Sequence, residues 1–172
     1  MKLQLKLSHW VLNRKAGKLS RKVQVHNFDT AKTVAVLWSF DENDAFRIVQ
    51  QHLQTKKNVT FVSLYFNSEK KASTDDINSF CKKQLNWIGF PKEGPAAGFL
   101  QQKPDILIDL TIKKKFPLQA MVSLSEALFK VGFGTGEYNP YDLNIDVRNK
   151  PEPVYLAQQI INYLNQINKK EE

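Results

Sequence analysis

Residues 34–66 read VAVLWSFDENDAFRIVQQHLQTKKNVTFVSLYF, and this stretch decides the fold. It begins with an apolar, β-rich run at residues 34–39 and ends with a second such run at residues 59–66. Between the two runs, apolar side chains recur at the spacing of one helix face: Ala45, Ile48, Val49 and Leu53. The pattern predicts a strand, a helix and a strand. Such a crossover is almost always right-handed, so we expect the two strands to be parallel.

The alternation of strands and helices continues along the rest of the chain. Further strands are expected in three segments: residues 105–110, 128–132 and 143–146. Further helices are expected in residues 75–85, in residues 95–102, from Pro117 onward, and in a C-terminal stretch with the stripe Val154, Ala157, Ile160, Ile161, Leu164 and Ile167. We therefore predict an α/β fold: a Rossmann-like, open, mostly parallel sheet with helices on both faces.

Length and composition fit one ordinary folded domain of 172 residues, with 42% hydrophobic and 24% charged side chains. The apolar runs are far shorter than the roughly 20 residues that cross a bilayer, and no signal-peptide stretch is expected. Cys81 is the only cysteine, which excludes an intrachain disulfide, and we expect a cytoplasmic protein. Cys81 should pack in the core, and Trp87 should pack the apolar loop 86–91 over the sheet edge.

The net charge of +8 is concentrated near the N-terminus. Residues 1–32 contain eight lysines and arginines and a single acidic residue, Asp29, whereas the remaining residues are nearly neutral. We therefore divide the chain into a basic N-terminal helix with its connector, residues 1–32, and a single α/β domain, residues 33–172. The basicity belongs to the first of these segments.

Four apolar residues near the N-terminus lie on one face of a helix that should end near Gly17: Leu3, Leu7, Trp10 and Val11. Such a face can dock on its own domain, on a membrane surface or on another protein, and docking on the domain is the commonest outcome. We expect this face to dock and six basic side chains to contact an anionic partner: Lys6, Arg14, Lys15, Lys18, Arg21 and Lys22. RNA, a ribonucleoprotein or another anionic partner is expected first. A protein partner, a membrane surface and a merely solvated face are the alternatives.

No motif of cofactor or metal chemistry stands out. Residues 132–136, GFGTG, have the glycine content of a phosphate-binding loop, but a strand follows them instead of the required helix. His9, His26 and His52 are scattered, and Cys81 has no cysteine partner, so the spacing of a metal site is missing. We expect residues 132–136 to be a flexible loop, and we expect no cofactor and no metal.

Polar side chains follow the ends of two predicted strands: Ser39 and Asp41 after the first, Asp109 and Thr111 after the third. Ligands of open α/β sheets bind outside the carboxyl ends of the strands, so these four residues are the candidate ligand pocket of a small enzyme or ligand-binding protein. Aspartates are also ordinary capping residues at such turns. We therefore favour a non-enzymatic interaction module and keep the enzyme or ligand-binding protein as the alternative.

Three segments together resemble a small uncharacterised bacterial protein family: LNWIGFP at 85–91, DILIDL at 105–110, and the run from Pro117-Leu118 through LSEA at 124–127 to FKVG at 129–132. The resemblance implies the α/β fold and a bacterial source, and it implies no activity. Residues 105–134 also look like part of the N-terminal half of heptosyltransferase-type glycosyltransferases. That likeness implies a half-fold without the nucleotide-sugar site, which those enzymes place in a second domain.

Overall fold

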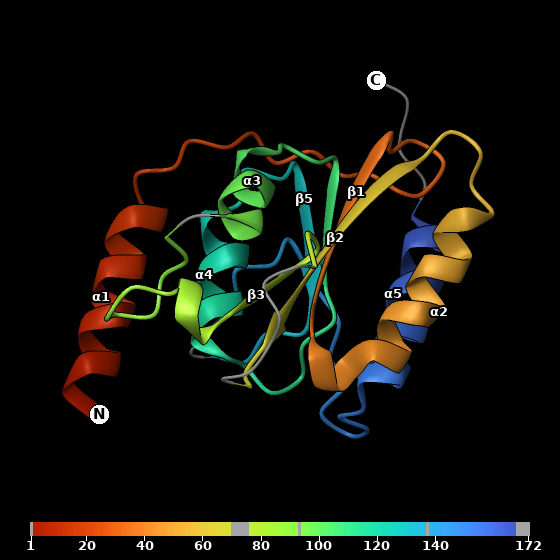
Figure 1. Ribbon diagram of the computed structural model, residues 1–172. Helices are drawn as coiled ribbons and strands as arrows, with labels where there is room; N and C mark the ends of the chain where they lie inside the picture. Colours follow the sequence, from red (N-terminus) through yellow and green to blue (C-terminus); the bar gives the residue numbers. More distant parts are fainter. Residues whose placement is uncertain (1, 70–75, 93, 137, 168–172) are drawn as a thin grey trace.

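A six-stranded, all-parallel sheet organises the protein. The computed structural model describes residues 2–69, 76–92, 94–136 and 138–167 (Figure 1). The strands lie in the order β3-β2-β1-β4-β5-β6. Their bounds are β1 (Thr33–Ser39), β2 (Thr60–Asn67), β3 (Ser79–Cys81), β4 (Ile106–Asp109), β5 (Phe129–Gly132) and β6 (Leu143–Asn144). The predicted fold class is confirmed, with a parallel crossover from β1 to β2.

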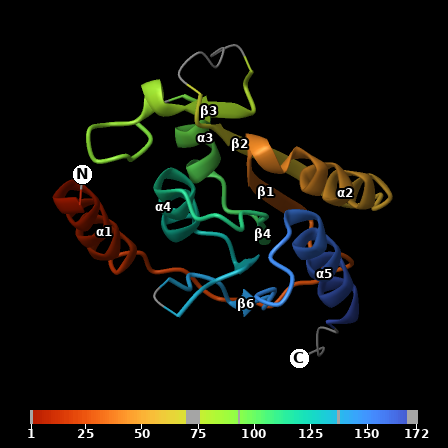
Figure 2. The ribbon, with the colours of Figure 1, turned by 90° about the horizontal axis from the view of Figure 1, so that it is seen from below.

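Helices cover both faces of the sheet, as predicted. They are α1 (Lys2–Ala16), α2 (Asn43–Gln54), α3 (Pro95–Gln101), α4 (Phe116–Leu124) and α5 (Pro153–Gln166), with 3₁₀ turns η1 (Phe40–Glu42) and η2 (Lys82–Gln84). Helices α2 and α5 lie on one face, and α3 and α4 lie on the other (Figures 1 and 2). Helix α1 packs outside α4, at the edge of the molecule.

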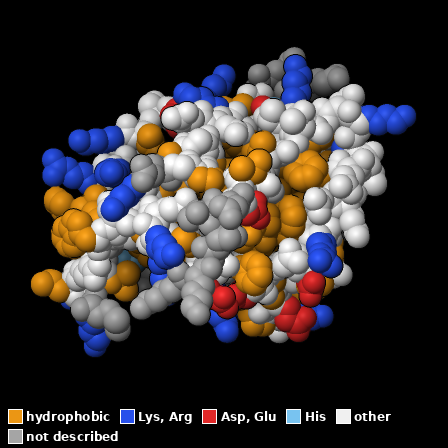
Figure 3. Space-filling model, in the orientation of Figure 1, with side chains coloured by type: hydrophobic (Ala, Val, Ile, Leu, Met, Phe, Trp, Pro, Cys, Tyr) orange, Lys and Arg blue, Asp and Glu red, His pale blue; other side chains and the backbone are white. Residues whose placement is uncertain are grey.

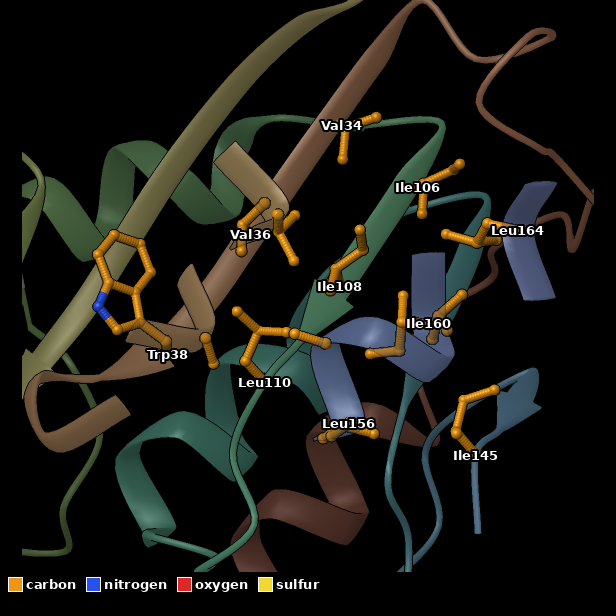
Figure 4. Packing of buried hydrophobic residues seen from close by; sticks show 14 of the residues in the cluster. Val34, Val36, Trp38, Ile106, Ile108, Leu110, Ile145, Leu156, Ile160 and Leu164 are labelled. Atoms are coloured by element: carbon orange, nitrogen blue, oxygen red, sulfur yellow. The ribbon is translucent and has the colours of Figure 1, made fainter. Parts of the chain in front are cut away.

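The burial of strand β1 on both faces explains its continuous apolar sequence. On β1, Val34 and Val36 join the core beneath α2 and α5, whereas Ala35 and Leu37 join the core beneath α3 and α4. Both faces of β1 are buried, so the strand reads as a continuous apolar run instead of an alternating one. Figure 4 shows β1 and β4 side chains opposite the α5 stripe, where Ile160 is fully buried as predicted.

Helix α1 docks on the domain, as expected, but the predicted docking face is wrong. The buried residues of α1 are Ser8 and Leu12. Leu12 packs with Phe90 and Ala120, and the Ser8 hydroxyl donates a hydrogen bond to the Ile88 carbonyl oxygen at 2.8 Å. Of the four residues expected to dock, only Val11 packs partly against this cluster; the other three are exposed: Leu3, Leu7 and Trp10.

Two further expectations are wrong. The described part of segment 75–85 forms β3 and η2 instead of a helix, because residues 79–81 pair with the end of β2; the expected first residue, Asp75, lies outside the described residues. Cys81 is nevertheless buried, as predicted. Trp87 is 70% exposed, because the apolar loop packs against α1 and α4 through Ile88 and Phe90 instead.

Candidate functional site

The strand order reverses between β1 and β4, which is where ligands of doubly wound sheets bind. The structure brings three of the predicted pocket residues to this reversal point. Ser39 ends β1, Asp109 ends β4, and Thr111 follows two residues later. Each of these three residues is only 1% exposed. Their side chains are therefore inside the protein.

Asp109 is the centre of a buried hydrogen-bond network. One carboxylate oxygen accepts from the Thr111 hydroxyl at 2.6 Å and from the Thr111 backbone N–H at 2.9 Å. The other oxygen accepts from the Tyr141 hydroxyl and lies 3.4 Å from Lys114 Nζ. Burial, with the Asp109 charge adding to it, raises the pKa of Tyr141 well above its usual value, so Tyr141 remains a neutral donor. Both Asp109 oxygens therefore serve to hold loops together.

Glu42 bridges the two sides of the reversal point, and the sequence analysis did not single it out. Its carboxylate accepts from the backbone N–H of Ser39 at 3.0 Å and from that of Ile112 at 3.1 Å. Burial raises the pKa of Glu42 to about 7, outweighing these two hydrogen bonds, which lower it. The spacing of Ser39 and Glu42 is that of a capping box, a signal from which this contact could have been predicted.

Asp41, the fourth predicted pocket residue, lies at the surface of the same region. Lys115 Nζ lies 2.5 Å from the Ser39 hydroxyl and 2.8 Å from an Asp41 carboxylate oxygen. The four predicted residues are thus close together. Their polar atoms bind one another and nearby lysines, so this part of the structure has the character of a structural network.

A small surface cavity lies at the same edge of the sheet, beyond the carboxyl ends of β5 and β6. Its volume is about 290 Å³, and it is lined by glycines and polar residues: Gly134, Thr135, Gly136, Asn139, Asn144, Asp146 and Arg148. The glycine-containing loop therefore forms one wall, and the Asn144 side chain accepts a hydrogen bond from the Gly134 backbone N–H at 2.7 Å. Arg148 pairs with Asp146 at 2.6 Å and lowers the pKa of that carboxyl to about 2.

The solvent-facing side of α1 combines exposed apolar and basic side chains. We call it the outer face of α1 and define it by six residues: Lys2, Leu3, Lys6, Leu7, Trp10 and Arg14. Leu3 is 82% exposed and Trp10 is 58% exposed. The Arg14 guanidinium lies 5.6 Å from the centre of the Trp10 ring. Figure 3 shows hydrophobic and basic side chains side by side over α1, and no acidic residue precedes Asp29 in the sequence.

The six basic residues predicted to contact a partner have different environments. Lys6 and Arg14 lie on the outer face of α1, and Lys18 and Lys22 are exposed just beyond the helix. Lys15 Nζ lies 5.0 Å from the centre of the Phe90 ring. Arg21 pairs with Asp142 at 2.6 Å and donates to the carbonyl oxygens of residues 127 and 128, so it ties the connector to the sheet.

Lys130 on β5 is a buried ionisable group close to this connector. Its side chain lies inside the protein, and its Nζ is 3.4 Å from the Ser123 carbonyl oxygen. Burial and the nearby charge of Arg21 lower the pKa of Lys130 to about 8. The ion pair of Arg21 with Asp142 therefore lies beside a lysine whose charged form is disfavoured.

Within the described residues, no group of three or more histidine, cysteine, aspartate or glutamate side chains could hold a metal ion. None of the helices described is both long and apolar enough to span a bilayer. Comparison with known proteins gives one family, described as a family of unknown function (DUF6913), which matches residues 4–167. No curated protein and no solved structure matches the chain.

Proposed function

Because the chain belongs to the DUF6913 family of unknown function, we propose its role from its own geometry: a non-enzymatic interaction module whose helix α1 contacts an anionic partner. The observation that carries this proposal is the outer face of α1, where Lys2, Lys6 and Arg14 are exposed and no acidic residue neutralises them along the helix. A cluster of like charges on one face attracts an anionic partner by long-range forces and counterion release.

The docked position of α1 supports the proposal. The buried Leu12 and the hydrogen bond from Ser8 to Ile88 hold the opposite side of the helix against the domain. The cations of the outer face are therefore presented from an ordered helix, which reduces the conformational entropy lost on binding. The buried Cys81 is compatible with the cytoplasmic location that we propose.

A salt titration tests the proposal. Binding is measured to a single-stranded RNA homopolymer and to phosphatidylserine vesicles, and we expect at least one of them to bind with an affinity that falls as salt rises. For RNA, the logarithm of the association constant should fall with the logarithm of salt by roughly 0.7 per phosphate contact. The double variant Lys6→Glu, Arg14→Glu should bind much more weakly than the wild type.

A matched control separates the outer face from net charge. Arg47→Glu with Lys57→Glu makes the same change in net charge at exposed positions on and after α2, across the sheet from α1. This control should bind almost as well as the wild type once moderate salt screens long-range attraction. Equal weakening in both double variants, or no binding to either probe, would refute the proposal.

The cavity beyond β5 and β6 supports a second candidate, a ligand-binding protein with a pocket at the carboxyl ends of the strands. The cavity volume of about 290 Å³ fits a small polar molecule, and Asn139 and Arg148 offer donors at its wall. Thermal-shift screening of small polar metabolites would support it if a compound raised the melting temperature of the wild type and not of Arg148→Ala. A screen without such a compound would count against it.

A further inference from the structure

We infer that the anionic partner of α1 is a phospholipid bilayer surface, into which Leu3, Leu7 and Trp10 insert while the neighbouring cations contact lipid headgroups. This inference rests on the proposed function and names its partner. It concerns a helix that lies along the membrane surface, since α1 spans only Lys2–Ala16 and carries four basic residues: Lys2, Lys6, Arg14 and Lys15.

The exposed apolar side chains are the first argument. Leu3, Leu7 and Trp10 follow one another at i, i+4 and i+7, so they form a continuous stripe along the helix. Scattered exposed apolar residues are normal on a protein surface, but a stripe of this kind on an ordered helix marks an interaction site. Domain packing does not use the stripe, because α1 docks through Ser8 and Leu12 on its other side.

The charges beside the stripe are the second argument. Lys6 and Arg14 lie on the same side of the helix as the leucines and Trp10, so apolar and basic side chains would meet a partner together. A bilayer offers both environments at once, because lysine and arginine keep their charges at the headgroups while their stems and the apolar side chains enter the interface. Tryptophan favours this interfacial region. RNA would bind the cations and stack on Trp10, but it would leave the two leucines in water.

The position of α1 is the third argument. The helix lies at the outer edge of the molecule, outside α4, so no other helix or strand lies over its outer face (Figures 1 and 2). Trp87, also highly exposed, lies next to the first turns of the helix, because the Gln4 side chain donates a hydrogen bond to the Trp87 carbonyl oxygen. A second exposed tryptophan therefore lies in the loop next to α1.

Vesicle co-sedimentation tests the inference. The full chain should bind phosphatidylcholine vesicles that contain phosphatidylserine and should bind pure phosphatidylcholine vesicles far less. The double variant Leu3→Ser, Trp10→Ser should lose at least about tenfold in affinity for the anionic vesicles, because two inserted side chains no longer contribute. Tyr163→Ser is the matched control: it removes an exposed aromatic side chain from α5, across the sheet from α1, and should bind like the wild type.

Fluorescence reports insertion directly. In Trp87→Phe, Trp10 is the one exposed tryptophan, since the remaining Trp38 is buried. Its emission should shift to the blue on addition of phosphatidylserine vesicles and should not shift with RNA alone. Unchanged melting temperatures for all these variants would show that the altered binding is not caused by unfolding, as expected for exposed side chains.

The outcomes separate the inference from the proposed function. Binding to RNA without binding to anionic vesicles would overturn the bilayer inference and leave the proposed function standing. Anionic vesicles that bind Leu3→Ser, Trp10→Ser as tightly as the wild type would also overturn it, because adsorption would then be electrostatic only. If neither vesicles nor RNA bind, both the inference and the proposed function fail.

Discussion

The carboxyl group of Glu42 should make the stability of the protein depend on pH. Its pKa is about 7 in the folded protein and 4.5 in the absence of the fold. The folded state therefore holds this proton more tightly, and the contribution of Glu42 to stability is fully present below about pH 4.5 and is lost as pH rises through about 7. Each unit of pKa difference corresponds to about 1.4 kcal/mol, which gives an upper value of about 3.5 kcal/mol for the whole change.

Urea denaturation of wild type and Glu42→Gln at about pH 5 and about pH 8 measures this contribution. From about pH 5 to about pH 8, the free energy of unfolding of the wild type should fall by about 2 to 3 kcal/mol more than that of the variant. Glutamine cannot accept both backbone hydrogen bonds, because its amide nitrogen is a donor, so the variant should be less stable by about 1 kcal/mol. That second effect is nearly the same at both pH values and drops out of the comparison.

The comparison also removes the effects of other titrating groups, because they are common to both proteins. Asp41→Asn is a useful second control, since Asp41 is an exposed carboxylate in the same turn and its loss should leave the wild-type pH dependence in place. If the free energy of unfolding falls equally in the wild type and in Glu42→Gln between the two pH values, Glu42 does not titrate as a buried group. The bridge that we assign to it between β1 and the segment after β4 would then be wrong.

Three other predictions concern the core and the docking of α1. Leu12→Ala should reduce the free energy of unfolding by about 2 to 5 kcal/mol, measured by urea denaturation, and should make α1 more sensitive to protease; a stable variant with a protected helix would contradict the packing against Phe90 and Ala120. Ile160→Asp should destabilise by several kcal/mol, roughly the cost of burying an unpaired carboxylate, and an unchanged melting temperature would show that α5 is peripheral. Wild-type stability should rise as pH increases from about 8 toward 10.5, because Lys130 is charged more readily in the unfolded chain; Lys130→Met should remove this rise and melt higher than the wild type at neutral pH.

The elements that were predicted correctly are long enough for their buried residues to form a regular apolar pattern in the sequence. Strand β1 and helix α5 have long apolar patterns, and both are buried where the pattern says they should be. Strand β3 has only three residues, and its conformation depends on pairing with the end of β2. A segment that short has no period of its own, so the apolar spacing within residues 75–85 predicted a helix instead.

The docking face of α1 could not be predicted from the helix alone. Its sequence contains two apolar stripes, one with Leu3, Leu7 and Trp10 and the other with Leu5 and Leu12. The second stripe is less hydrophobic, but Ser8 lies beside it and its hydroxyl donates a hydrogen bond to the Ile88 carbonyl oxygen. The choice between the stripes is made by a surface 80 residues away in the sequence.

The closeness of Ser39 and Asp109 was predicted, because the carboxyl ends of parallel strands lie at the same edge of a sheet; the reversal of the strand order between β1 and β4 is known only from the structure. The contacts that use their polar atoms were not predictable in the same way. Tyr141 reaches Asp109 across 32 positions of sequence, and Lys115 reaches Ser39 across 76. No local pattern encodes such pairs, whereas the local pair of Ser39 and Glu42 does have a recognisable spacing.

Helix α1 is synthesised before the surface on which it docks. Leu12 packs on Phe90 and Ala120, so the docking site is complete only after more than a hundred further residues have been added. At about 5 to 20 residues per second, this leaves α1 without its site for roughly 5 to 20 s of translation. Both apolar stripes face solvent during that interval, and a nascent chain arrested before Ala120 should be cut within α1 by a protease that spares the helix in the finished protein.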